Sequence, residues 1–122
     1  QKLFYIIPID RYYIEQFLNN HRDVIYGDIM EIANHTYTYQ FGHDIKHAYA
    51  LHIDGLGDKD TIIGNLVTGE GIRNNMVNCF ICTQTLQVVY DIRNFVKHAY
   101  EMLIPGGGII TYRKRDKSAF LE

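Results

Sequence analysis

Apolar residues gather in five short runs along the chain, and longer polar or amphipathic stretches separate most of them. We expect strands at residues 28–32, 48–53, 61–64, 79–83 and 108–112. The fourth run is apolar throughout, which is typical of a strand covered on both faces. Spacings of about a dozen residues between most runs favour βαβ crossovers and a parallel sheet.

Two amphipathic helices accompany these runs. The first is expected from its N-cap Asp10 to about His21, and one of its faces holds Ile14, Phe17 and Leu18. The second begins after Asp91 and ends before Pro105-Gly106-Gly107. Its apolar residues recur at helical spacing: Ile92, Phe95, Val96, Ala99, Met102 and Leu103. The pattern therefore predicts an α/β fold: a doubly wound, mainly parallel five-stranded sheet with helices on both faces.

The length of 122 residues indicates a single domain. We divide it into an N-terminal helical cap (1–24), a Rossmann-like core (25–112) and a charged tail (113–122). The net charge of −2 gives no reason to expect nucleic acid as a partner, and no apolar run approaches the roughly 20 residues of a membrane span. Two cysteines without a disulfide framework favour a reducing, cytoplasmic location.

Two spacings invite a metal site, and neither is convincing. Cys79 and Cys82 are three apart on an expected strand, so their side chains should point to opposite faces as buried, inert thiols. His43 and His47 would share a helix face but lack a third ligand, so surface positions are the better interpretation. We predict no metal.

In open parallel sheets, ligands bind beyond the carboxyl ends of the strands. The candidate positions are therefore those that follow each expected strand: residues 31–37, 49–54, 65–66 and 83–85. At these positions the chain resembles the class I S-adenosylmethionine-dependent methyltransferases, most closely a bacterial subgroup similar to the methyltransferase type 11 family. The matching segments, in the family's order, are Pro8–Tyr13, Glu31–Thr38, Ile62–Leu66, Thr83–Leu86 and Leu103–Gly107.

The resemblance implies S-adenosyl-L-methionine as cofactor and a small-molecule or glycan-precursor methyl acceptor. Glu31 would face the cationic methionine end, an acid after the second strand would bind the ribose, and Asn65 would bind adenine. The implied cofactor-binding residues are Glu31, Ala33, Asn34, His35, Tyr37, Tyr49, Asp54, Asn65, Leu66, Thr83 and Gln84. His35, Tyr12 and Tyr13 are the candidates for a catalytic role.

The chain departs from the family at several positions. No glycine lies between Gly27 and Gly42, and His35 is bulky enough to fill part of the site. Tyr49 falls where the ribose acid is expected, and Asp54 would serve only if its strand runs longer. These departures keep a second hypothesis open, a degenerate domain with a structural or ligand-sensing role. A nicotinamide-dependent oxidoreductase is less favoured because no G-x-G-x-x-G follows the first strand.

The family's last two strands are also missing, since only ten residues follow Tyr112. The fifth strand would then be a bare apolar edge. We therefore expect either a fragment or a second subunit, as in a homo-oligomer, that covers this edge.

Overall fold

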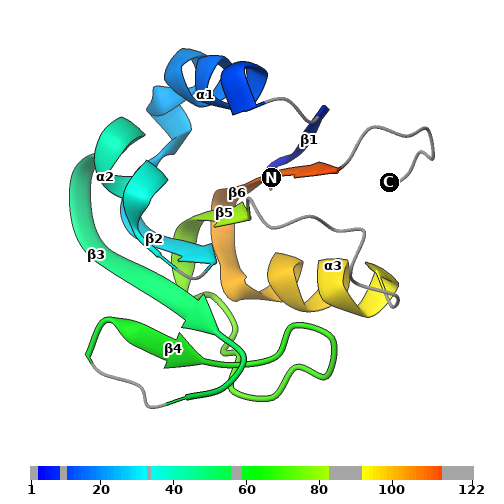
Figure 1. The fold of residues 1–122 in the computed structure, drawn as a ribbon. Helices are drawn as coiled ribbons and strands as arrows, with labels where there is room; N and C mark the ends of the chain where they lie inside the picture. The colour runs from blue at the N-terminus through cyan, green and yellow to red at the C-terminus, as the bar shows by residue number, and fades with distance from the viewer. Residues whose placement is uncertain (1–2, 9–10, 33, 56–58, 83–91, 114–122) are drawn as a thin grey trace.

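The computed structural model describes residues 3–8, 11–32, 34–55, 59–82 and 92–113. Its centre is a six-stranded sheet in the order β1-β6-β5-β2-β3-β4, and every neighbouring pair is parallel (Figure 1). The expected parallel α/β architecture is confirmed. The elements are β1 (Leu3–Pro8), α1 (Arg11–Asn20), the 3-10 helix η1 (Arg22–Val24), β2 (Tyr26–Ile32), α2 (Thr36–Phe41), β3 (His43–His52), β4 (Thr61–Ile63), β5 (Val77–Cys82), α3 (Ile92–Met102) and β6 (Leu103–Arg113).

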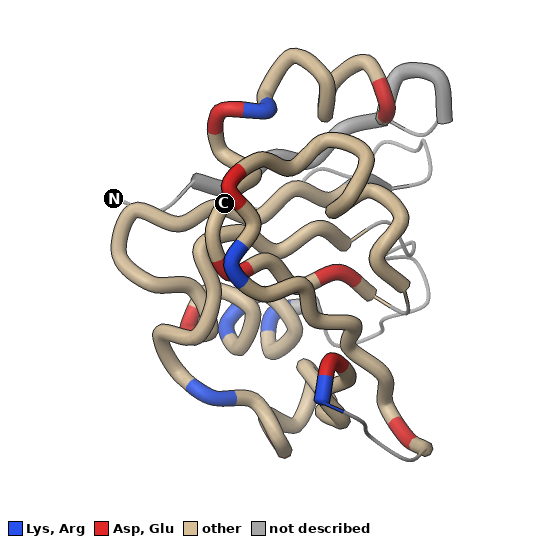
Figure 2. The backbone as a smooth tube through the Cα atoms, turned by 90° about the vertical axis from the view of Figure 1, so that its left-hand side faces the viewer, with Lys and Arg blue, Asp and Glu red and all other residues tan. Residues whose placement is uncertain are grey.

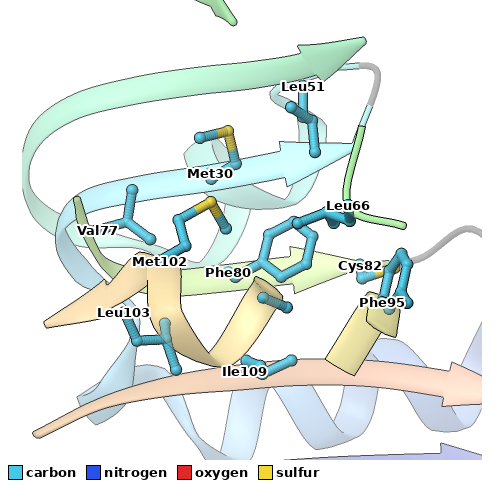
Figure 3. Packing of buried hydrophobic residues seen from close by; sticks show 11 residues of the cluster. Met30, Leu51, Leu66, Val77, Phe80, Cys82, Phe95, Met102, Leu103 and Ile109 are labelled. Atoms are coloured by element: carbon cyan, nitrogen blue, oxygen red, sulfur yellow. The ribbon is translucent and has the colours of Figure 1, made fainter. Parts of the chain in front are cut away.

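The side chains of the central strands alternate between two hydrophobic clusters, one on each face of the sheet. Met30 and Phe80 pack with Phe95 and Met102 of α3 in the first cluster (Figure 3). The second cluster contains the alternate strand residues Ile29, Cys79 and Ile81, together with Ile14 and Leu18 of α1 and Tyr37 and Phe41 of α2. Helical residues therefore cover both faces. Of the apolar stripe predicted for α1, Ile14 and Leu18 are buried and Phe17 is partly buried against the second cluster.

The strand beside β6 corrects one expectation. Residues 3–8, which the sequence places in a helical cap, form β1 and pair in parallel with β6 from Leu3↔Gly108 to Pro8↔Arg113. The fifth expected strand, residues 108–112, therefore has no bare edge for a second subunit to cover. The sheet has six strands instead of five because an apolar segment from the N-terminal region completes it.

Two further elements differ from the prediction. β3 begins at His43, so His43 and His47 lie on a strand and do not share a helix face. The second long helix ends at Met102, and Pro105-Gly106-Gly107 lies inside β6. There β6 bulges, because Val77↔Leu103 is followed directly by Cys79↔Gly108 in the pairing with β5.

Charge is distributed as the composition suggests. Acidic and basic residues are both spread over the described backbone (Figure 2). No helix within the described ranges is long and apolar enough to cross a membrane.

Candidate functional site

The carboxyl ends of β2, β3 and β4 lie together where these strands end, and we call this end of the sheet its carboxyl edge. The pairs Ile32↔Leu51 and His52↔Ile63 bring the three strand ends level. β2 lies in the interior of the sheet, between β5 and β3. Because all these strands are parallel, the segments that follow them meet at this edge.

Glu31, near the end of β2, is almost completely buried at 1% exposure. Its Oε1 accepts hydrogen bonds from the Thr38 N–H and the Thr38 hydroxyl, both at 2.9 Å, and its Oε2 accepts one from the Tyr37 N–H at 3.2 Å. Burial raises the pKa of this carboxyl above its ordinary value, although the bonds from Thr38 and Tyr37 partly oppose that effect. The carboxylate predicted to face a ligand thus binds the first turn of α2.

The side chains that follow β2 differ in whether their polar atoms have hydrogen-bond partners within the chain. The exposed Asn34 accepts a hydrogen bond from the Thr36 N–H at 3.0 Å. The Nδ1 atom of His35 is buried and has no hydrogen-bond partner among the described residues. Tyr37 is buried in the core, where its hydroxyl donates to Glu15 of α1 at 3.3 Å. Of these side chains, that of His35 keeps an unused polar atom.

Tyr49 lies inside β3, and Asp54 lies after it. Tyr49 lies within β3 opposite Met30, packs against the first hydrophobic cluster and stacks on His47 at 5.7 Å. β3 continues to His52, so the exposed Asp54 is the acid that follows its carboxyl end. β3 ends at His52, one residue before the end of the expected strand 48–53, so the longer strand that Asp54 is expected to need is not present at this end.

The turn after β4 is held by its own hydrogen bonds. Asn65 Oδ1 accepts from the N–H groups of Val67 at 2.8 Å and Thr68 at 3.2 Å. Leu66 is a buried core residue, and its carbonyl accepts a hydrogen bond from His98 Nδ1 of α3 at 2.7 Å. Sequence reasoning missed His98, because nothing in the helical pattern links a polar residue of α3 to this distant turn.

Several predicted positions cannot be placed at the site. Ala33, Thr83 and Gln84 lie outside the described residues, and so does the side chain of each tyrosine of the pair Tyr12 and Tyr13 on α1. Asp10 and Asp91, the predicted N-caps, are also outside them.

The two thiols behave as predicted. Cys79 and Cys82 are free and buried, and they belong to the two hydrophobic clusters on opposite faces of the sheet. Burial raises the pKa of Cys79 to about 12. His47 pairs with Asp28 at 2.7 Å, and within the described part of the chain no group of three His, Cys, Asp or Glu side chains could hold a metal ion.

Comparison with protein-family models, with curated proteins and with solved structures finds no match to this chain.

Proposed function

We propose that this chain binds S-adenosyl-L-methionine at the carboxyl edge of β2, β3 and β4 and transfers its methyl group to a small-molecule or glycan-precursor acceptor. One observation carries the choice of ligand class: the Glu31 carboxylate already occupies the N–H groups of Tyr37 and Thr38 at the start of α2.

Because these N–H groups are already bonded to Glu31, the site favours S-adenosylmethionine over a dinucleotide cofactor. A dinucleotide places its pyrophosphate on the N–H groups of the helix that follows the first strand. Here a buried carboxylate fills those groups and would also repel a phosphate. S-adenosylmethionine has no phosphate and carries positive charge at its sulfonium and ammonium, so the same carboxylate favours it.

The order of the strands supports a doubly wound, Rossmann-like assignment. Counted from β2, the five strands β2 to β6 follow the spatial order 3-2-1-4-5 that such folds share, with β1 added beyond β6. The direction of winding reverses between β2 and β5, and ligands of such sheets bind at this switch point. β2 flanks this point; Glu31 is its last residue but one, and His35 lies in the segment between β2 and α2.

The chemistry would depend on positioning. When bound, the cofactor would supply a methyl group on a sulfonium, which an acceptor atom would displace in line, and the chain's own residues would hold the two partners in that geometry. Asp54, exposed beyond β3, would accept hydrogen bonds from the ribose hydroxyls. Its carboxylate would hold the cofactor while the segment after β2 orients the methionine end.

A second candidate, the degenerate domain that no longer transfers methyl groups, is favoured by a specific observation. Asn65 Oδ1 and the Leu66 carbonyl, which would serve adenine, are both used within the chain. A domain that does not transfer methyl groups needs no unbonded hydrogen-bond acceptor for adenine at that turn.

Calorimetric titration with S-adenosylmethionine, S-adenosylhomocysteine and NADH tests the proposal. We expect heat with the first two ligands and none with NADH. Asp54→Ala should weaken S-adenosylhomocysteine roughly tenfold or more, as expected for lost hydrogen bonds to a charged acceptor. Asp23→Ala is the matched control, because it removes an exposed carboxylate from η1 at the opposite edge of the sheet. A folded wild-type protein that gives no heat with either adenosyl ligand would move the assignment to the degenerate domain.

A further inference from the structure

Among the described residues that follow β2, one buried polar atom has no hydrogen-bond partner. His35 Nδ1 is shielded from solvent, and no described group donates to it or accepts from it. The ring centroid lies 5.8 Å from that of Tyr39, and the two rings are tilted by 59°. Unpaired buried polar atoms are rare in native proteins, and each one calls for an explanation such as a ligand that completes it.

Three neighbouring N–H groups are already paired. The N–H groups of Tyr37 and Thr38 donate to Glu31, and the Thr36 N–H donates to Asn34. A negatively charged ligand group that approached this segment would find those donors occupied. In residues 34–38, His35 is the one side chain that can carry positive charge.

The amino-acid part of S-adenosylmethionine carries both an ammonium and a carboxylate. Glu31 favours the ammonium, but the carboxylate needs a donor or a positive charge of its own. We infer that His35 Nδ1 donates a hydrogen bond to the carboxylate of the bound cofactor's amino-acid moiety, which makes His35 a specificity-determining residue. This inference rests on the proposed function.

Two ligands separate this contact from the rest of the site. S-adenosylhomocysteine has the amino-acid moiety, whereas 5′-methylthioadenosine keeps the adenosine and lacks it. We expect His35→Ala to weaken S-adenosylhomocysteine roughly tenfold and to leave 5′-methylthioadenosine unchanged, since a hydrogen bond to a charged group is lost only with the first ligand. His35→Asn, whose amide can replace Nδ1 as a donor, should recover part of the loss.

The control is His43→Ala, an exposed histidine at the start of β3 and so at the opposite edge of the sheet, which should change neither affinity. Imidazole-nitrogen NMR of the wild-type protein adds a measurement that does not depend on a variant folding. The Nδ1 resonance of His35 should shift with S-adenosylhomocysteine and stay in place with 5′-methylthioadenosine.

The outcomes distinguish the two proposals. Equal weakening of both ligands by His35→Ala, or an Nδ1 resonance that ignores S-adenosylhomocysteine while it binds, overturns the role of His35 and leaves the proposed function standing. A wild-type protein that binds neither ligand overturns both.

Discussion

The carboxylate of Glu31 receives three hydrogen bonds from Tyr37 and Thr38 while almost no part of the residue reaches solvent. The sequence indicates Glu31 as a candidate ligand-binding acid. It does not indicate these hydrogen-bond partners, because residues 36–41 carry no helical signal. Their β-branched and aromatic side chains are poor helix formers, and a six-residue helix is unstable alone. The buried carboxylate stabilises the first turn of α2 by satisfying its free N–H groups.

The raised pKa of Glu31 has a consequence for stability. Because burial raises the pKa above its ordinary value of 4.5, the folded state binds this proton more tightly than the unfolded chain. Protonation of Glu31 therefore stabilises the folded state. This contribution to the free energy of unfolding is fully present at pH values below the ordinary pKa, and it is lost as pH rises through the raised pKa of the folded state. Glu31→Gln cannot titrate, so we expect the wild type to lose stability relative to this variant as pH rises across that window.

Urea unfolding of both proteins from about pH 4 to about pH 8 measures this difference. The exposed Glu70→Gln, in the turn after β4, is the matched control, and its difference from wild type should vary less with pH. A wild type that gains stability over Glu31→Gln as pH rises would contradict the expected direction.

At the scale of elements, the connection between β4 and β5 contains no helix in its described residues, yet it covers part of the first hydrophobic cluster. Leu66 is buried, and Ile72 and Met76 pack against the same hydrophobic cluster as α3. Backbone bonds fix this path: the Asn75 N–H donates to the Glu101 carbonyl at 2.9 Å and the Met76 N–H to the Met102 carbonyl at 2.7 Å. These partners lie at the end of α3, so the shape of the connection depends on a helix that comes later in the chain.

Gly71 is required where this connection passes β4. Its φ of +78° is left-handed, and a Cβ there would lie 2.3 Å from the Ile63 carbonyl oxygen. We expect Gly71→Ala to lower the free energy of unfolding by about 3 kcal/mol, of which about 1 kcal/mol comes from the backbone conformation and the rest from the collision.

Gly55→Ala separates the two contributions. Gly55 also has a positive φ, +110°, but a Cβ there meets nothing within 4 Å. Chemical denaturation should therefore show the larger loss for Gly71→Ala. Equal losses for the two variants would mean that the collision with Ile63 is relieved at no cost.

At the scale of the whole molecule, the sheet is completed by pairing between the two ends of the described chain. β1 contacts β6 along six residue pairs, from Leu3↔Gly108 to Pro8↔Arg113. A strand edge left without this cover is a template for association with another chain. The edge that the sequence assigns to a second subunit is thus occupied by the protein's own N-terminal segment.

Removal of residues 1–8 tests the importance of this pairing. We expect the shortened chain to associate or to lose its cooperative unfolding, because the apolar β6 becomes an open edge. Light scattering coupled to size exclusion measures the mass in solution, with the full chain as reference. A shortened chain with the mass of a monomer and unchanged thermal unfolding would contradict this view of β1.

The sequence alone determined the features that depend on local periodicity. Five strand segments, the two long helices and the opposite faces of Cys79 and Cys82 follow from apolar spacing, because that spacing reports which side chains a regular element buries. The tertiary structure decided what depends on distant partners. β1 is a strand because β6 lies beside it, and β3 begins at His43 instead of Ala48 because it pairs with β2 from Tyr26 onward. Glu31 has its hydrogen bonds because α2 folds back onto it. Hydrogen bonds between segments far apart in the chain leave no periodic trace in either segment.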